Sequence, residues 1–468
     1  MLEFYKDAKI RIFLRNVKFC SLNGFSFRFG HGFIKKIFNF ENLYGFDMGA
    51  ILLKNIVVEG VASDVLLEGG LIGRIVPSGE QIVLPEDVEV VDCEGKTLMP
   101  GFINMHTHAG MTLMRGAGED MPLHDWLDKI WTLEKDLDEE YVYHATKVAC
   151  LEMIKTGTTT FNDQYWYMPM AYKAASELGL RAALSYVFLD RNIEEESERQ
   201  KIQSQEMYEA AKSWGDTAQL VISIHAIYTV REPMIRWAAD FARQRGLKIH
   251  IHVSETEKEV ADCMAQHDGM SPVEYLDSLG VLGPDVIAAH SLWLSDKDVE
   301  ILGKRGVTCV HNVNSNLKLA SGYKFRYNEL RDAGANVCLG TDGCASSNNL
   351  DMLETMKTAA IVQKAWRNDP AAMPLNELLS MATVNAAKAL GLNAGKIEEG
   401  ALADLLIINT DSHNFLSSGS FEANLVYSAH SDCVDSVICN GKFIMRNRVV
   451  PGEKEILAQA RKVLNRVG

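Results

Sequence analysis

The chain has 468 residues, of which 47% are hydrophobic and 23% charged, and its formal net charge is −15 at pH 7. These proportions are typical of a globular protein with a large core, and the length fits one large domain with a smaller one. The acidic balance argues against nucleic-acid binding, which needs a basic surface. No apolar run reaches the roughly 18–20 residues that span a bilayer, so we also expect no membrane partner.

The first 47 residues differ in composition from the rest of the chain. Phenylalanines alternate with basic residues such as Lys9, Arg11 and Arg15, and these charges interrupt the apolar run that a secretory signal needs. Such a segment suits an arm that binds a membrane surface or a partner. Alternatively, it is translated upstream sequence, and the protein proper begins at Met48. We treat residues 1–47 as an N-terminal extension without a role.

Short strands near both ends of the chain predict a second, smaller domain. Residues 48–98 contain glycine pairs and alternating apolar residues (ILLKNIVVEG, DVLLEGGLIGRIV), which are typical of a small antiparallel sheet. Residues 399–452 show the same pattern of short apolar strands and turns, in GALADLLIINT and CVDSVICNGKFIMRN. We expect both stretches to pair into one composite β domain, and a helix to follow at 453–468.

Between these stretches, residues 99–398 alternate short apolar strands with helices. The eight expected strands cover 101–106, 158–163, 181–188, 219–225, 246–252, 285–290, 306–311 and 335–342. Later helices are expected near 350–366 and 373–391. Continuous apolar strands that alternate with helices predict parallel βαβ units of an α/β fold. Eight of them favour a closed (β/α)₈ TIM barrel, with a doubly wound open sheet as the alternative.

Polar side chains close six of the apolar runs: His106, His225, His252, His290, His311 and Asp342. The C-terminal ends of the strands form the active-site face of a TIM barrel. His106 and His108 are two residues apart, so on a strand both point to the same side. With His252 and Asp342 they offer three nitrogens and one carboxylate. This set suits one divalent ion, with Zn²⁺ as the first choice and Fe²⁺ or Mn²⁺ as alternatives.

Two further residues lie close to His252 in the sequence. Glu255 follows three residues later, where a carboxylate can act as general acid or base on a metal-activated water. His250 forms a second HxH pair with His252, but it lies deeper in the strand and is interpreted as structural. The pattern predicts a metal-dependent hydrolase.

Five motifs carry a wider resemblance: MPGFINMHTHAGMTLMRGAGED, HVSETEKE, AAHSLWL, HNVNSNLKLASG and LGTDGCASSNN. From Met48 onwards the chain resembles the amidohydrolase superfamily, in its cytosine deaminase/chlorohydrolase branch, and most of all the 5-methylthioadenosine/S-adenosylhomocysteine deaminase group. The resemblance implies a (β/α)₈ barrel with a composite sheet domain and a hydrolytic deaminase that releases ammonia from C6 of an adenine nucleoside. It also implies the four metal ligands given above. Relatives with two ions carry a lysine after the fourth strand, which SIHAIYT lacks, so one ion is expected.

The resemblance also implies roles for the other site residues. Glu255 resembles the proton shuttle, and His290, with Asp342, resembles the group that orients the attacking water. The implied substrate contacts are Trp126 at the pocket wall, Glu134 at the ribose hydroxyls and His225 at the purine ring.

Two positions depart from the group. Tyr186 stands where the group has an arginine for the carboxylate of S-adenosylhomocysteine, and Ile227 stands where proline is common. Arg191 and Arg199 are the candidates to replace that arginine. The departures favour methylthio-, deoxy- or plain adenosine as the substrate.

Two other functions fit the same residues. One is hydrolysis of a free base (guanine, cytosine, isoguanine) or of a halotriazine, which needs no ribose contact from Glu134. The other is a catalytically silent binding protein, whose mark would be loss of a metal ligand or of Glu255, and none is lost. The nine scattered cysteines, never in CxxC spacing, indicate reduced thiols and a cytoplasmic location. The resemblance suggests a homo-oligomer.

Overall fold

Eight parallel strands occupy the predicted positions to within a few residues. The computed structural model describes residues 49–467, so the predictions for residues 1–47 lie outside the described residues. The strands are β6 (Phe102–Thr107), β7 (Thr158–Gln164), β8 (Arg181–Phe188), β9 (Ala218–Ile224), β10 (Lys248–Val253), β11 (Val286–His290), β12 (Thr308–His311) and β13 (Asn336–Leu339). They pair side by side in sequence order.

The last and first of these strands meet at their C-terminal ends. The Asp342 N–H donates to the carbonyl of His106 at 2.9 Å. The Asn104 side chain donates to Thr341 Oγ1 at 2.7 Å and accepts from the Thr341 N–H at 3.0 Å. The sheet therefore curls into a nearly closed barrel, which confirms the (β/α)₈ prediction over the open sheet. Closure also brings Asp342 beside His106.

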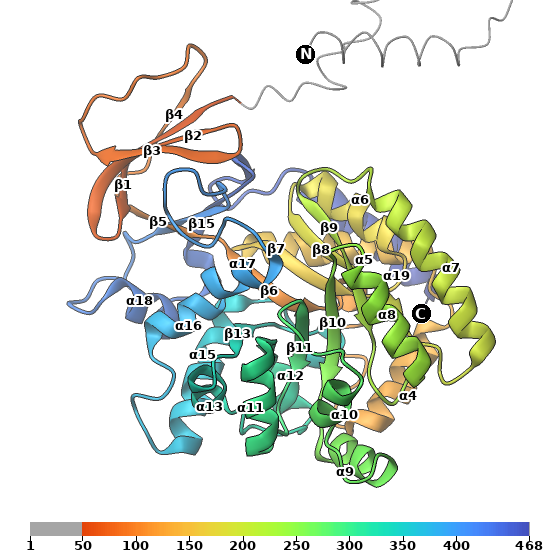
Figure 1. Ribbon diagram of the computed structural model, residues 1–468. Helices are drawn as coiled ribbons and strands as arrows, with labels where there is room; N and C mark the ends of the chain where they lie inside the picture. The colour runs from red at the N-terminus through yellow and green to blue at the C-terminus, as the bar shows by residue number, and fades with distance from the viewer. Residues whose placement is uncertain (1–48, 468) are drawn as a thin grey trace, which may run out of the picture. The chain divides into compact units, whose positions relative to one another are not determined.

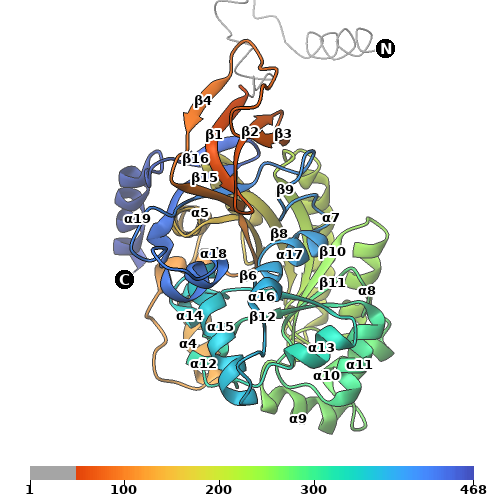
Figure 2. The same ribbon diagram turned by 90° about the vertical axis from the view of Figure 1, so that its left-hand side faces the viewer.

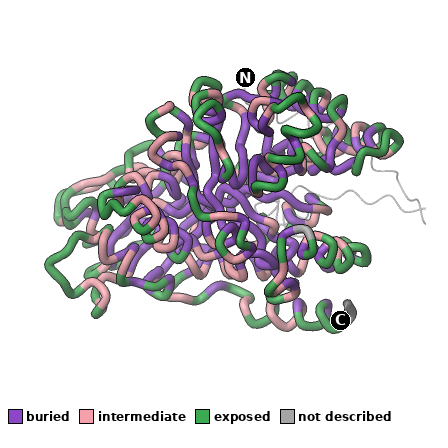
Figure 3. Tube along the Cα trace, turned by 90° about the horizontal axis from the view of Figure 1, so that it is seen from below, coloured by how far each residue is buried: buried purple, intermediate pink, exposed green. Residues whose placement is uncertain are grey.

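Helices surround the barrel strands (Figure 1). Up to the sixth strand they are α4 (Leu123–Glu134), α5 (Glu139–Lys155), α6 (Met168–Leu178), α7 (Glu194–Ala211), α8 (Glu232–Arg243), α9 (Glu257–Gln266) and α10 (Pro272–Ser278). After it come α11 (Asp296–Arg305), α12 (Val313–Lys318), α13 (Tyr327–Asp332), α14 (Cys344–Ser347), α15 (Met352–Arg367), α16 (Leu375–Met381), α17 (Val384–Leu390) and α18 (Phe421–Ala423). Figure 3 shows the buried strands at the centre and exposed residues on the outer helices.

The stretch predicted as a helix near 373–391 is divided into α16 and α17. Thr383 lies between them with φ −135° and ψ −96°, outside the helical region. None of the helices in the described part of the chain is long and apolar enough to cross a membrane.

Both ends of the described chain build a second sheet (Figures 1 and 2). Its strands are β1 (Ile51–Val58), β2 (Val61–Glu68), β3 (Leu71–Pro77), β4 (Glu89–Asp92), β5 (Lys96–Pro100), β14 (Leu405–Asn409), β15 (Val434–Cys439) and β16 (Lys442–Met445). Their order is β16-β15-β14-β5-β1-β2-β3, and β4 pairs with β1. The antiparallel pair of β14 with β5 joins the two ends. The composite β domain is confirmed, while its limits at 48–98 and 399–452 stay predictions. The last helix, α19, spans Glu453–Val467.

A buried ion pair ties the composite sheet to the barrel. Arg181 at the start of β8 donates from Nε to Asp404 Oδ2 at 2.7 Å, and their side chains are only 5% and 2% exposed. Asp404 also accepts the Asn440 N–H at 2.7 Å. Its charge is therefore compensated only by contacts inside the protein.

We expect Arg181→Ala to lower the free energy of unfolding by about 3–5 kcal/mol, because it leaves the Asp404 carboxylate buried without its cation. Urea denaturation measures this. The control is Arg74→Ala, which breaks a pair with Glu399 whose side chains are 62% and 45% exposed. That change should cost below about 1 kcal/mol. Equal losses in the two variants would contradict the prediction.

Candidate active site

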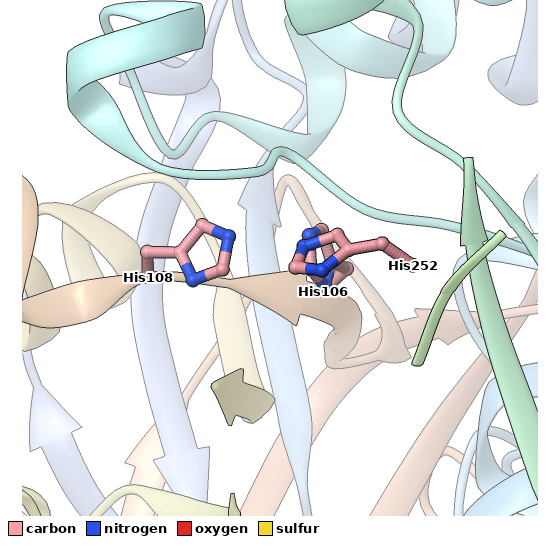
Figure 4. Close-up of side chains that lie close together, drawn as sticks. All are labelled: His106, His108 and His252. Carbon is pink, nitrogen blue, oxygen red and sulfur yellow. The ribbon is translucent and has the colours of Figure 1, made fainter. Parts of the chain in front are cut away.

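Three histidines from two strands converge at the C-terminal end of the barrel (Figure 4). His106 lies in β6, His108 directly follows it, and His252 lies in β10. One ring nitrogen of each lies within 4.8 Å of the others. An overlapping group of His106, His290 and Asp342 meets the same limit. The structure therefore brings together all four residues predicted as metal ligands, with His290 beside them.

The outer nitrogens of these rings are fixed by neighbouring groups. His108 Nδ1 donates to the carbonyl of Gln164 at 2.5 Å, and His252 Nδ1 donates to the carbonyl of His225 at 2.8 Å. His106 Nδ1 lies 2.9 Å from His250 Nε2, so His250 supports the cluster from outside it. Such outer bonds orient ligand histidines and set their tautomers.

The inner nitrogens fit a metal ion. Since Nδ1 of His108 and of His252 carries the proton, their Nε2 atoms face the centre as lone-pair donors. The buried Nε2 of His106 makes no hydrogen bond of good geometry among the described residues, although Asp342 Oδ1 lies 3.4 Å from it. A buried polar atom without a partner is costly, and coordination of a cation removes that cost.

Asp342 supplies negative charge to this centre. Its Oδ1 lies 3.4 Å from His106 Nε2 and 3.2 Å from His108 Nε2, and its Oδ2 accepts from Ser315 Oγ at 2.6 Å. Burial alone would raise the pKa of Asp342, but the contacts with both histidines hold it well below its usual range.

The pKa shifts of the histidines point to a cation site. Burial lowers the pKa of His106 to about 4 and that of His252 well below its usual value, so both rings are neutral. Burial also disfavours charge on His108, yet the Asp342 carboxylate outweighs it and raises the pKa of His108 to about 9. The same field attracts a metal cation in place of that proton.

Glu255 and His290 face each other at the edge of the cluster. Glu255 Oε2 lies 3.7 Å from His290 Nε2, and His290 Nδ1 lies 2.8 Å from Asn316 Oδ1. Burial raises the pKa of Glu255, His290 partly offsets the shift, and the Asp342 charge adds to it. A carboxyl with a raised pKa is suited to accept and return a proton near neutral pH.

The cluster opens into a narrow aromatic pocket. Its lining includes Trp126, Trp131, Glu134, Tyr165, Trp166, Val187, His225, Tyr228 and Leu319. Glu134 accepts a hydrogen bond from Tyr165 Oη at 2.7 Å, and burial raises the pKa of Glu134. His225 is neutral, because burial lowers its pKa to about 3, and its Nδ1 lies 2.9 Å from Thr229 Oγ1. Three of the four predicted substrate contacts, Trp126, Glu134 and His225, therefore lie in one pocket.

Two glycines of the GMTLMRGAG motif let the aromatic walls come close. A Cβ at Gly110 would lie 2.1 Å from the Tyr165 ring, and one at Gly118 would lie 2.4 Å from the Trp126 ring. Trp126 Nε1 donates to the carbonyl of Ala345 at 3.2 Å, which fixes that wall.

The fourth predicted contact, Tyr186, lies in an adjoining larger cavity of about 640 Å³. The two spaces share Trp131, Glu134, Tyr165, Trp166 and Val187. Tyr186 Oη donates to Gln203 Oε1 at 3.0 Å. Arg191 and Arg199 also line this cavity. The Arg191 guanidinium lies 5.5 Å from the centroid of the Trp131 ring, and Arg199 Nε donates to Glu196 at 2.9 Å.

Sequence reasoning missed several supporting residues. Tyr165, Asn316 and Ser315 each bond to a predicted site residue. Ser315 and Asn316 stand in the HNVNSNLKLASG motif, but no spacing in it assigns them a partner. Tyr165 lies two residues after the end of the predicted strand 158–163. Only this position near a strand end could have indicated a role in the site.

Comparisons with known proteins show which sequences this chain is similar to. Residues 97–444 match the model of the amidohydrolase family. The 5′-deoxyadenosine deaminase of Methanoregula boonei is 46% identical over 79% of this chain and 84% of its own length. The 5-methylthioadenosine/S-adenosylhomocysteine deaminase 1 of Archaeoglobus fulgidus is 42% identical over 81% of this chain and 90% of its own.

Solved structures have the same fold. An adenosine deaminase of Xanthomonas campestris with bound zinc is 31% identical and superimposes with a TM-score of 0.83, over 89% of this chain and 98% of that one. The atrazine chlorohydrolase of Arthrobacter aurescens, complexed with zinc, reaches a TM-score of 0.81 at 21% identity, over 88% of this chain and 100% of that one. At that identity the second likeness concerns the fold alone.

Proposed function

Because the chain belongs to the amidohydrolase family, shown by the match over residues 97–444, we propose that it is a metal-dependent aminohydrolase of adenine nucleosides. The observation that carries this proposal is the pocket that Glu255, His225 and Glu134 line together with residues of the His/Asp cluster. Relatives named as 5′-deoxyadenosine and 5-methylthioadenosine/S-adenosylhomocysteine deaminases, 40–46% identical, support it.

We propose one divalent ion, Zn²⁺ in first place, held by His106, His108, His252 and Asp342. Histidine nitrogens and carboxylate oxygens are both ligands that zinc binds in proteins, and these residues offer three of the first and one of the second. When bound, the ion supplies Lewis-acid activation of a water molecule at neutral pH. Zinc in the Xanthomonas campestris adenosine deaminase supports this choice.

The protein's own side chains move the protons. Glu255 takes a proton from the attacking water and delivers it to N1 of the purine ring, which its buried position beside His290 supports. His290, held through Nδ1 by Asn316, keeps Nε2 directed at the oxygen that attacks C6. The second proton, from the hydroxyl now on C6, passes through Glu255 to the amino group. Collapse of the tetrahedral carbon then breaks the C6–N bond, releases ammonia and leaves the 6-oxo, inosine-type product with its proton on N1.

The substrate contacts follow the pocket lining. His225, neutral and held by Thr229, faces the purine ring, and Trp126 forms the pocket wall. Glu134, which is half-buried, accepts hydrogen bonds from the ribose hydroxyls. The 5′ group then points to the larger cavity. There Tyr186 is paired with Gln203 and Arg199 with Glu196, while the Arg191 guanidinium lies over the Trp131 ring. We therefore propose an uncharged 5′ group, as in 5′-deoxyadenosine, methylthioadenosine or adenosine.

An ammonia-release screen tests the proposal. The zinc-loaded protein is given adenosine, 5′-deoxyadenosine, methylthioadenosine, S-adenosylhomocysteine, guanine and cytosine. We expect turnover of the first three, weaker turnover of S-adenosylhomocysteine, and none of the free bases. Turnover of guanine or cytosine without the nucleosides would replace the proposal with a free-base deaminase, and no ammonia from any of the six would refute it.

Replacing Glu134 tests the ribose contact. We expect Glu134→Gln to lower kcat/KM for adenosine about 10- to 100-fold, since hydrogen bonds to a charged group contribute about 1.5–3 kcal/mol. With 2′,3′-dideoxyadenosine, which lacks both hydroxyls, the variant and the wild type should differ little. Asp128→Asn, on the exposed face of the same helix α4, is the matched control. An unchanged ratio between the two substrates would contradict the contact.

We further propose a cytoplasmic homo-oligomer without a nucleic-acid partner. The eight cysteines of the described residues are all free and buried, which supports the cytoplasmic location. The net charge of −15 supports the absence of a nucleic-acid partner. Light scattering of the purified protein tests the oligomer, and a monomer at micromolar concentration would contradict it.

A further inference from the structure

The peptide before Glu255 has an unusual backbone. Ser254 lies between the end of β10 and Glu255, is fully buried, and has φ +52°. A left-handed conformation costs a residue other than glycine about 1–3 kcal/mol. Such a conformation persists only where surrounding contacts impose it. The contacts that impose this turn therefore also decide where Glu255 lies.

One carboxylate holds this turn. The Ser254 N–H donates to Glu259 Oε1 at 2.9 Å, and the Glu255 N–H donates to Glu259 Oε2 at 2.7 Å. Glu259 is only 7% exposed, so water does not compete well for these bonds. Burial raises the pKa of Glu259 to about 7, while the two N–H groups favour its ionised form. Hydrogen bonds to that ionised form are about twice as strong as neutral ones.

The other side of the same turn is held by the loop after β11. The Ser254 carbonyl accepts from the N–H groups of Leu292 at 3.1 Å and Trp293 at 2.9 Å. β11 ends at His290 and the loop begins with Ser291, and both residues also have left-handed backbones (φ +68° and +45°). The turn that carries Glu255 is thus tied to the strand end that carries His290.

An ordinary helix cap does not account for these bonds. Glu259 is the third residue of α9, and the N-cap Thr256 accepts from its N–H at 3.1 Å. In a capping box the third residue returns a bond to the N–H of the N-cap residue, as Glu274 does for Ser271 in α10. In α9 the carboxylate instead bonds the two residues before the N-cap.

We propose that Glu259 is a positioning residue for the deamination. By holding the Ser254–Glu255 turn, it keeps the Glu255 carboxyl beside His290 and within reach of the substrate. This inference rests on the proposed function, because it concerns the carboxyl assigned there as the proton carrier.

The test compares Glu259→Gln with Glu257→Gln. An amide has one acceptor oxygen, and its NH₂ group would face the second N–H, so one bond is lost with little change of shape. Glu257 is exposed in the same first turn of α9, so its replacement removes the same charge without touching the turn. A displacement near 1 Å costs about 10²-fold in rate. We therefore expect E259Q to lower kcat about 10- to 100-fold, with KM and metal content unchanged, and E257Q to match the wild type.

Two results would overturn the inference. One is a folded, metal-loaded E259Q whose kcat lies within about threefold of E257Q, even if its thermal stability is lower, because that is the result of a helix cap alone. The other would come from hydrogen exchange in the wild type. We expect the amides of Ser254 and Glu255 to exchange with solvent as slowly as those of β10. Exchange at the rate of a free peptide would mean that the turn is not held.

Amide exchange keeps the inference testable if E259Q does not fold. It also separates the two proposals, because it needs no substrate. A wild type that releases no ammonia counts against the proposed function, whereas wild-type activity in E259Q counts against the role of Glu259 alone.

Discussion

Glu255→Gln is expected to lower kcat for adenine-nucleoside deamination about 10²- to 10⁴-fold, the range that a positioned general acid–base contributes. Glutamine keeps the shape of the side chain but can neither accept nor return the proton. Glu255 is not one of the residues proposed as metal ligands, so metal content should stay at the wild-type value.

The pH dependence gives a second measurement for the same variant. Glu255 must be ionised to take a proton, so activity is lost as the pH falls through its pKa. Burial raises this pKa, so the acid limb of the wild-type kcat/KM profile should lie above the pH expected of an ordinary carboxyl. In E255Q that limb should disappear. A variant that retains both the wild-type rate and the limb would exclude Glu255 as the proton carrier.

The barrel and its metal cluster could be predicted because local sequence encodes them. Strands buried on both faces read as continuous apolar runs, and barrel closure places their ends together whatever the details of packing. His106, His252 and Asp342 each close such an apolar run. Their positions along the chain therefore predicted that they lie together at one end of the barrel. The division of the helix at Thr383 escaped the pattern, because apolar periodicity continues across it.

The residues that hydrogen-bond to the reactive side chains and fix their orientation could not be predicted from strand and helix patterns. Asn316 reaches His290 from 26 positions away and Ser315 reaches Asp342 from 27, and neither spacing follows a helix or strand period. Ser254 has a left-handed backbone although it is not a glycine, so its residue type does not predict this conformation. Contacts of this kind depend on the closed barrel and are visible only in three dimensions.

Asp342→Asn should abolish measurable deamination, a loss of at least about 10³-fold, since the ion contributes several kcal/mol of charge stabilisation. The substitution removes the negative charge of the Asp342 carboxylate and keeps the size of the side chain. The bond from the Asp342 N–H to the carbonyl of His106 is backbone to backbone, so the barrel closure survives it. Asparagine also tolerates the left-handed φ of +64° found at this residue.

The metal content decides between a ligand and a structural aspartate. After dialysis against a chelator and return of zinc, the wild type should recover its ion and its activity, whereas D342N should recover neither. Ser315→Ala removes only the hydrogen bond to Asp342 Oδ2, and loss of such an outer bond costs about 10- to 100-fold in metal affinity or activity. Its zinc affinity should therefore lie between those of the wild type and D342N. If D342N bound zinc with wild-type affinity, the carboxylate would not be a ligand, and the cation site would rest on the histidines alone.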